Sequence, residues 1–238
     1  MPKSNILGVS PVGFNTSSSL IVDGKCVFAV EEERMVREKR TRKFPFRGID
    51  AALSKADLSI SDIDTIAVSW NPAINLEAHS APQSSKPRYL GEIFYSVPSH
   101  LMTLQAQERE IVLSRQSIEF ADGEHLSIAY VNHHVAHAGC FFVSPFDEAA
   151  ILTVDAFGEK NCVTFSQGKG NKIERLWSQD FPQTLGSFYS SLTEFCGFRP
   201  QNDEWKLMGA SSYGDSKRFY KPLRDLFRLN EDTGFSLN

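Results

Sequence analysis

Three of the six histidines fall within five positions, in the run Asn132-His133-His134-Val135-Ala136-His137-Ala138. The pattern over residues 133–143 predicts a helix, and residues four apart on a helix share one face. His133 and His137 would therefore project together and could bind one metal ion. His134 would point about 100° away from them, by the rotation per residue of a helix.

A single aspartate, Asp155, follows the next apolar run, residues 149–154, which we predict to be a strand. Two imidazoles and one carboxylate form a donor set for a divalent ion and leave coordination positions open for phosphate or water. Iron, manganese and zinc all fit this set, and the sequence does not choose among them. The alternative is that the histidines are hydrogen-bonded packing residues of a half-apolar helix.

The composition is that of an ordinary globular protein, with 238 residues, 41% apolar and 23% charged, and a net charge of −4. This balance favours neither nucleic acid nor a membrane surface as a partner. No apolar stretch has the length of a signal segment or a membrane span, so we expect a soluble, cytoplasmic protein. The cysteines are widely spaced without a C-x-x-C pair, which indicates reduced thiols: Cys26, Cys140, Cys162 and Cys196.

A faint internal repeat bears on the architecture. At an offset of 145, four early residues match four later ones: Ile6, Leu7, Val9 and Gly13 against Ile151, Leu152, Val154 and Gly158. Each copy predicts three strands, over 5–10, 17–22 and 25–32 and over 149–154, 161–167 and 172–178. Asp23-Gly24 is a strong signal for a two-residue hairpin turn, and Gly168-Lys169 is the matching turn that we predict in the second copy.

Strands and helices alternate after the first copy, which predicts a mixed sheet covered by helices. We expect strands at 65–69 and 127–131 and helices at 47–57, 97–117, 184–197, 204–212 and 217–229. Two such units describe an α/β fold of the actin-like ATPase type, in which a hairpin of each half holds nucleotide phosphates. Residues 1–145 would form the first half-domain and residues 146–238 the start of a second, incomplete one.

Several motifs occur in an order that points to a family: Asp23-Gly24-Lys25, Ala29 to Arg34, Phe44-Pro45, Asn132 to Ala138, Ser144-Pro145-Phe146, Thr153 to Glu159 and Lys206 to Gly214. Together they resemble the N-terminal part of the carbamoyltransferases, the family of nodulation protein U, cephalosporin carbamoyltransferase and tobramycin carbamoyltransferase. The resemblance extends over residues 5–214.

The resemblance implies transfer of a carbamoyl group from carbamoyl phosphate, through an ATP-dependent carbamoyl-adenylate, to a hydroxyl of a small acceptor such as a sugar or an antibiotic. By family position, His133, His137 and Asp155 look like three iron ligands, with a further aspartate expected later in the family's chains. Gly158, Lys206 and Gly209 look like nucleotide or carbamoyl phosphate contacts. The alternatives are a simple turn glycine at Gly158 and a solvated lysine at Lys206.

The chain departs from the family pattern at two places. Where the family carries His-Asp-Ala-Ser-Ala, this sequence reads Phe14-Asn15-Thr16-Ser17-Ser18, and Trp205 stands in place of a small residue before Lys206. The usual imidazole and carboxylate are missing from the first loop, so another group must do their work or activity is weakened. The second half-domain also looks truncated, and we expect the adenylate-forming C-terminal domain to lie outside this sequence. We therefore expect this chain alone to be inactive, with the missing part or a second copy as its partner.

Other interpretations stay open. The rival to a transferase is a non-catalytic or degenerate metal- or nucleotide-binding module of the same fold. A sugar kinase is disfavoured, because such enzymes usually position magnesium with carboxylates rather than with histidines. The charged segment Arg34 to Lys43 is read as a solvated surface or as an anion-binding site through Arg34 or Arg37. The polar stretch 77–86 is read as an exposed loop and a candidate lid over an acceptor.

Overall fold

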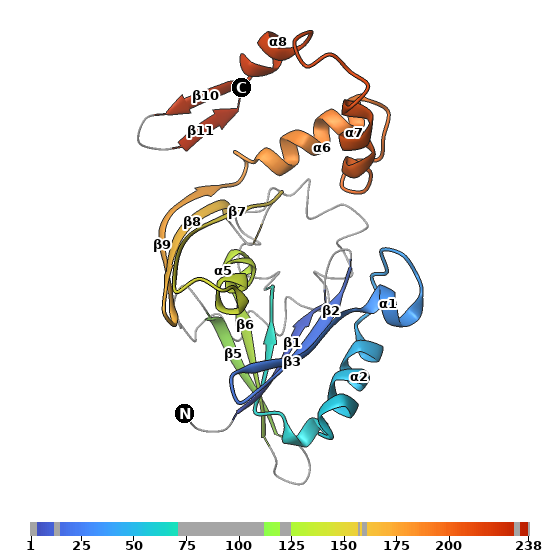
Figure 1. Cartoon of the computed structure of the whole chain (residues 1–238), viewed down its shortest axis with the longest axis vertical. Helices are drawn as coiled ribbons and strands as arrows, with labels where there is room; N and C mark the ends of the chain where they lie inside the picture. The colour runs from blue at the N-terminus through green and yellow to red at the C-terminus, as the bar shows by residue number, and fades with distance from the viewer. Residues whose placement is uncertain are drawn as a thin grey trace. The chain divides into compact units, whose positions relative to one another are not determined.

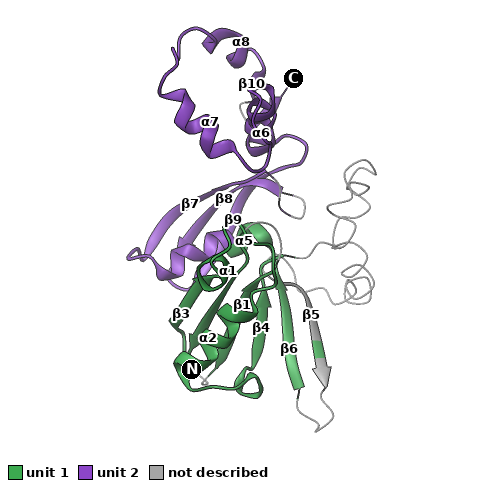
Figure 2. Cartoon of the chain, turned by 90° about the vertical axis from the view of Figure 1, so that its right-hand side faces the viewer, with its two compact units in different colours: residues 1–136 green, residues 137–238 purple. Residues whose placement is uncertain are grey.

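The computed structural model describes residues 4–11, 15–70, 112–119, 125–156, 158, 161–230 and 234–237. The chain forms two compact units, residues 1–136 and 137–238 (Figure 1 and Figure 2). The division falls inside one helix, α5 (His133–Ala138), which runs from one unit into the other. The predicted boundary at residue 145 follows the sequence repeat and stays a prediction.

The first unit contains a mixed six-stranded sheet in the order β3-β2-β1-β4-β6-β5. Its first three strands form an antiparallel meander, β4 and β6 are parallel to β1, and β5 is antiparallel to β6. The strands are β1 (Asn5–Ser10), β2 (Ser17–Val22), β3 (Lys25–Glu31), β4 (Thr65–Val68), β5 (Val112–Glu119) and β6 (His125–Val131). The predicted mixed α/β fold with flanking helices is confirmed for this unit.

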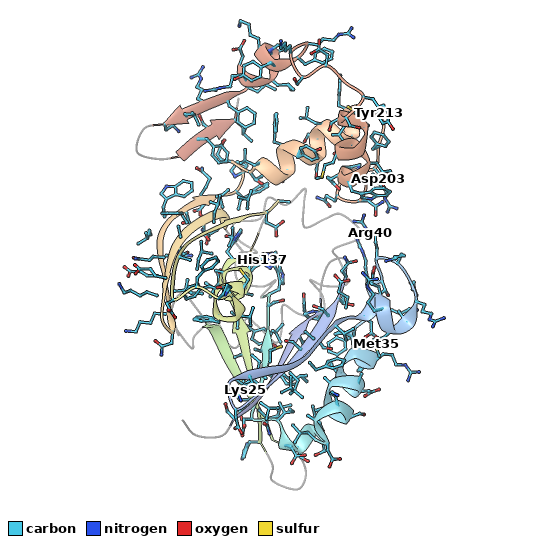
Figure 3. The ribbon with its side chains drawn as sticks, viewed as in Figure 1. Lys25, Met35, Arg40, His137, Asp203 and Tyr213 are labelled. Atoms are coloured by element: carbon cyan, nitrogen blue, oxygen red, sulfur yellow. The ribbon has the colours of Figure 1, made fainter. Side chains whose placement is uncertain are left out.

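The meander follows directly from its sequence. Asp23 and Gly24 both have positive φ, 50° and 79°, as the predicted two-residue turn requires. Figure 3 labels Lys25, where β3 leaves this turn. Leu7, Val9 and Leu20 are buried in the unit's apolar core, because alternate residues of a strand share one face.

Helix α2 (Phe46–Ala56) packs against β2 and β3 and adds Ala52 to that core. The buried carboxylate of Glu32, in the short helix α1 (Glu32–Val36), accepts hydrogen bonds from the backbone N–H groups of Arg47 and Gly48. An anion at this position satisfies N–H groups that the first turn of a helix leaves unpaired. The glutamate thereby fixes where α2 begins. A short 3₁₀ helix, η1 (Ile60–Asp62), then leads into β4.

The second unit contains an antiparallel meander of three strands, β7 (Glu148–Val154), β8 (Asn161–Lys169) and β9 (Lys172–Asp180). The 3₁₀ helix η2 (Gly139–Val143) places Phe141 in a small core with Ile151. The remaining elements are α6 (Leu185–Phe195), α7 (Glu204–Ser211), α8 (Tyr220–Arg224) and a hairpin of β10 (Phe227–Asn230) and β11 (Gly234–Leu237). Figure 3 labels Asp203 and Tyr213, which flank α7.

Most of the predicted elements are confirmed within two residues of their ends, but three predictions are wrong. Residues 112–117, predicted to be helical, lie in strand β5, which is held by pairing with β6 far along the chain. The predicted helix at 217–229 reduces to α8, because Phe227–Asn230 pairs with β11 instead. Gly168-Lys169 lies within β8, and the turn is Gly170-Asn171, since Lys169 pairs with Lys172. The rest of the predicted helix, 97–111, lies outside the described residues.

The predicted helix at 133–143 is α-helical only as far as Ala138 and continues as η2. All four cysteines are free, in line with the reduced thiols that we expected. Among the described residues, no helix combines the length and the apolar character needed to cross a membrane.

Candidate metal centre

Helix α5 follows β6 after one residue, Asn132, which caps the helix. The side-chain oxygen of Asn132 accepts a hydrogen bond from the N–H of Val135, and its backbone carbonyl accepts one from Ala136. Asparagine is among the best residues at this position, because its side-chain oxygen accepts a hydrogen bond from an N–H that has no partner within the helix. The cap fixes the first turn and therefore the direction of His133. His134, on another face as predicted, is 1% exposed.

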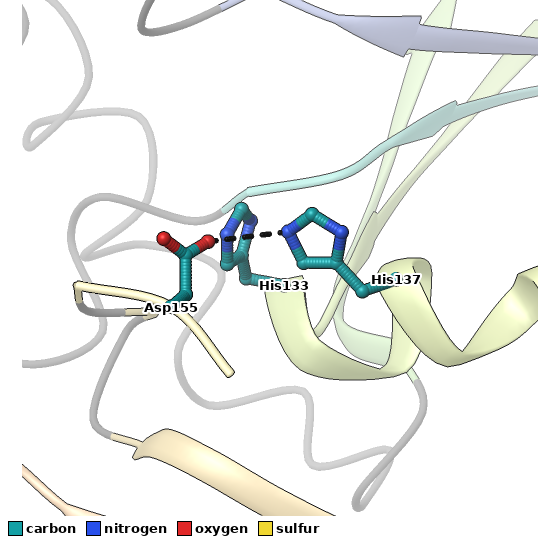
Figure 4. A group of neighbouring side chains, drawn as sticks. All are labelled: His133, His137 and Asp155. Carbon is teal, nitrogen blue, oxygen red and sulfur yellow. Dashed lines mark ion pairs between the residues drawn. The ribbon is translucent and has the colours of Figure 1, made fainter. Parts of the chain in front are cut away.

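The structure brings the three predicted ligands together (Figure 4). Each of His133, His137 and Asp155 offers one ligand atom, and these three atoms all lie within 4.8 Å of one another. His133 and His137 are one turn apart on α5, and Asp155 follows the end of β7. The sequence predicts this arrangement, because it requires only helix α5 and the end of strand β7.

The spacing of the donor atoms fits a shared ion. His137 Nε2 lies 3.3 Å from Asp155 Oδ2. Metal–ligand bonds of about 2.0–2.2 Å put neighbouring ligand atoms about 3.0–3.5 Å apart. The widest pair of donor atoms, up to 4.8 Å apart, would have to approach by up to about 1.3 Å to reach that range.

The electrostatics of this pair favour a cation. The hydrogen bond from His137 to Asp155 raises the pKa of the imidazole above its ordinary value of 6.5, and partial burial opposes the rise. The proton that stabilises the pair occupies the place where a divalent ion would bind. Metal and proton therefore compete for His137 Nε2, as they do for ligating histidines generally.

His133 has contacts that orient its ring. Its Nδ1 lies 3.4 Å from the backbone carbonyl oxygen of Ser69, and the ring of Trp70 packs edge-on against it, with centroids 4.9 Å apart. A proton on Nδ1 directed at that carbonyl leaves the lone pair on Nε2. Ligating histidines commonly donate their other N–H in this way.

The backbone of Asp155 is held by strand β8. Its N–H donates to the carbonyl oxygen of Cys162 at 2.9 Å, and its Oδ1 accepts from the N–H of Ala156 at 2.7 Å. With Oδ1 engaged, Oδ2 is the oxygen that faces His137. The carboxylate thus presents one oxygen to the candidate ion.

The nearby thiol of Cys162 is a poor ligand. It is fully buried, and burial raises its pKa to about 11. Metal ions bind the thiolate rather than the thiol, so the neutral group does not compete with the two histidines.

The structure places the other three predicted site residues in different settings. Gly158 is buried, and its N–H donates to the carbonyl oxygen of Asn161, which closes the loop before β8. Lys206, on α7, lies 2.9 Å from a buried carboxylate, Asp203, whose pKa it lowers. Gly209 is exposed on the same helix, with no atom within 4 Å of where a Cβ would stand. Nucleotide contact at these three residues stays a prediction.

The charged segment 34–43 contains internal ion pairs. Lys39 pairs with the buried carboxylate of Glu33 at 2.8 Å, and Lys43 pairs with Glu38. Arg34 lies 3.7 Å from Glu33. These pairs favour the solvated interpretation of the segment over an anion site. Phe14 and the candidate lid at 77–86 lie outside the described residues.

Two residues at the start of α6 that belong to no functional motif of the sequence contact the backbone of Asp155. They are Thr184, which caps the helix, and Gly186 in its first turn. A threonine directly before the apolar Leu185 is a helix-start signal that could have found the cap. The contact with Asp155 has no sequence signal, because it joins segments 29 residues apart.

The family model for the carbamoyltransferase N-terminus matches residues 5–238. An uncharacterized protein of Synechocystis is 33% identical over 99% of this chain, and an uncharacterized protein of Methanocaldococcus jannaschii is 30% identical over 87%. Nodulation protein NolNO of Sinorhizobium fredii is 31% identical, also over 87%. The chain spans 39%, 33% and 28% of the lengths of these three relatives.

Proposed function

Because this chain belongs to the carbamoyltransferase family, as a match to its N-terminal region, we propose that it forms the metal-binding part of an ATP-dependent carbamoyltransferase. One observation carries the proposal, the convergence of His133, His137 and Asp155 within 4.8 Å. The family match gives that cluster its chemical meaning, and the 3.3 Å between His137 Nε2 and Asp155 Oδ2 is the spacing expected for two ligands of one divalent ion.

In the proposed reaction, carbamoyl phosphate, ATP and water yield a carbamoyl-adenylate, pyrophosphate and inorganic phosphate, and a hydroxyl of a small acceptor then takes the carbamoyl group. The hydroxyl oxygen bonds to the carbamoyl carbon, the bond from that carbon to the AMP phosphate oxygen breaks, and AMP leaves. The hydroxyl proton passes to a base. A sugar or an antibiotic is the acceptor class that we propose.

In that scheme, the residues of this chain bind the metal ion and contact the nucleotide or carbamoyl phosphate. His133 and His137 supply neutral nitrogens and Asp155 one carboxylate oxygen, a set that suits iron first and zinc or manganese next. When bound, the ion would neutralise charge on phosphate oxygens of the leaving group. Gly158, Lys206 and Gly209 are the residues that we propose for contact with the nucleotide or carbamoyl phosphate.

We further propose the actin-like architecture for the whole protein. The support is the repeated meander, β1–β2–β3 and β7–β8–β9, with the same antiparallel pairing in each copy. Residues 1–145 would belong to the first half-domain and residues 146–238 to the second. The relatives are longer than this chain, and we propose that the remainder of such a protein, or a second copy, is its partner.

The test begins with metal content. Anaerobically purified chain should contain near-stoichiometric metal by elemental analysis, and the His133→Ala/His137→Ala double variant should lose it. His125→Ala is the matched control, because His125 is an exposed histidine of β6 outside the cluster. Equal metal in the wild type and the double variant would overturn the site.

The second step asks for the reaction. The protein at the length of its relatives is supplied with carbamoyl phosphate, ATP and a panel of sugars, and AMP and carbamate esters are measured. Formation of both, lost in the double variant, supports the transferase. Metal binding without AMP formation supports the non-catalytic alternative.

A further inference from the structure

The first turn of helix α6 contacts the backbone that carries the candidate ligand Asp155. Thr184 caps this helix, since its Oγ1 accepts a hydrogen bond from the N–H of Ser187 at 3.3 Å. The same oxygen lies 2.6 Å from the carbonyl oxygen of Ala156 and 3.1 Å from that of Asp155. A hydroxyl has one proton, so it donates mainly to the nearer oxygen while the other stays in reach. Thr184 is 1% exposed, so water does not replace these bonds.

Gly186 allows the close approach of the two backbones. A Cβ at this residue would lie 2.5 Å from the nitrogen of Ala156, 2.6 Å from its Cα and 2.7 Å from the carbonyl carbon of Asp155. All three are backbone atoms, which no side-chain rotation can move aside. Any residue other than glycine would therefore push the helix and the Asp155–Ala156 peptide apart.

The peptide is held from the other side as well. The N–H of Asp155 is bonded to Cys162 of β8, and the N–H of Ala156 is bonded to Asp155 Oδ1. A shift of the peptide would carry this N–H with it and turn the carboxylate. The oxygen that faces His137 would then leave its present distance of 3.3 Å. The first turn of α6 thus controls where a donor atom of the candidate site stands.

We propose that Thr184 and Gly186 are positioning residues that set the Asp155 carboxylate for metal binding, an inference that rests on the metal site of the proposed function. Neither residue offers an atom to the ion. Their contribution is geometric, and outer partners of metal ligands commonly change affinity by about 10- to 100-fold.

The experiment measures Co²⁺ binding to the whole chain by titration, together with the visible absorption of the bound ion, which reports its coordination. Thr184→Val removes the hydroxyl and should weaken Co²⁺ binding by about 10- to 100-fold and change the spectrum. Thr184→Ser restores the hydroxyl and should return both to wild-type values. Gly186→Ala should weaken binding at least as much as Thr184→Val.

Thr193→Val is the matched control. Thr193 lies in the same helix, is 0% exposed and donates its hydroxyl to the carbonyl oxygen of Tyr189. This variant also removes a buried hydroxyl from α6 but has no contact with Asp155 among those described. It should lower the melting temperature and leave the affinity and the spectrum unchanged.

Equal loss of Co²⁺ affinity in Thr184→Val and Thr193→Val would overturn the proposal in favour of a purely structural role. Wild-type affinity in Thr184→Val would overturn it as well. If Gly186→Ala fails to fold, the threonine series decides alone. A wild-type chain that binds no Co²⁺ overturns this inference and the metal site together. If the chain binds Co²⁺ as described but the protein at the length of its relatives forms no AMP or carbamate ester, only the proposed reaction is refuted.

Discussion

The meanders β1–β2–β3 and β7–β8–β9 can be compared residue by residue through their strand pairing. In the first, Ser10 pairs with Ser17 at the loop end of the hairpin, and in the second Val154 pairs with Val163. The residue that directly follows the first strand is Pro11 in the first copy and Asp155 in the second. The same backbone frame ends in a candidate ligand in only one copy. A repeated scaffold thus supplies a position, and the residue at that position decides the chemistry.

The two copies bury one face alike but differ in the exposure of the other. Leu7, Val9 and Leu20 of the first meander are between 0% and 4% exposed, and Ile151, Cys162 and Val163 of the second are between 0% and 7% exposed. On the other face of β7, however, Leu152 and Val154 are 65% and 49% exposed. The first copy contributes to a core under helix α2. The second places Ile151 in the small core with Phe141 and leaves apolar side chains exposed on the other face of β7.

Leucine truncations test whether the buried and the exposed leucine side chains contribute differently to stability. Leu20→Ala should lower the free energy of unfolding by about 2–5 kcal/mol, because it leaves a cavity in a closed core. Leu152→Ala should change it by less than about 0.5 kcal/mol, since that side chain is mostly exposed. Urea unfolding followed by circular dichroism measures both. Similar losses in the two variants would contradict the difference in packing.

The difference in chemistry can be tested at the two residues that follow these strands, Pro11 and Asp155. Asp155→Ala removes a ligand and should weaken Co²⁺ or Zn²⁺ binding by at least about 100-fold, beyond what loss of an outer partner costs. Pro11→Ala should leave binding unchanged. Isothermal titration gives both affinities. A comparable loss at Pro11 would show that the first loop also takes part.

The two-residue turns should behave alike. Gly24 and Gly170 have φ values of 79° and 57°, and no atom lies within 4 Å of either Cβ position. Alanine at either residue should therefore cost about 1–2 kcal/mol from backbone conformation alone. Thermal unfolding of the two variants measures the cost. A loss at one turn only would show that the repeat does not extend to the turns.

Raising the pH should strengthen metal binding at the second loop. The pKa of His137 is raised above 6.5 by Asp155, so the ion pair is fully formed below that value and is lost as the pH rises through the folded-state pKa. Stability of the metal-free chain due to this pair falls over the same range. Metal affinity should rise by up to about tenfold per pH unit there and level off above it. Titrations from pH 6 to 8 measure this rise, and a flat profile would contradict competition at His137.

Local signals account for what the sequence predicts well. Asp23-Gly24 carries its own turn preference, and His133 and His137 need only a helix to share a face. Strand β5 could not be found in this way, because it forms through pairing with β6 rather than through its own pattern. Thr184 and Gly186 were missed for the same reason, since their role appears only when α6 meets the Asp155–Ala156 peptide. Features set by neighbouring residues can therefore be predicted from the sequence, whereas contacts between distant segments cannot.

The buried thiol of Cys162 has a consequence for covalent chemistry. With a pKa near 11, it stays protonated at neutral pH and is a weak nucleophile toward peroxides and alkylating reagents. Cys26, Cys140 and Cys196 are exposed, so reagents such as maleimides will react with these three first. Spectroscopic labels can therefore be attached to the surface while the sulfur beneath the Asp155 loop remains unmodified.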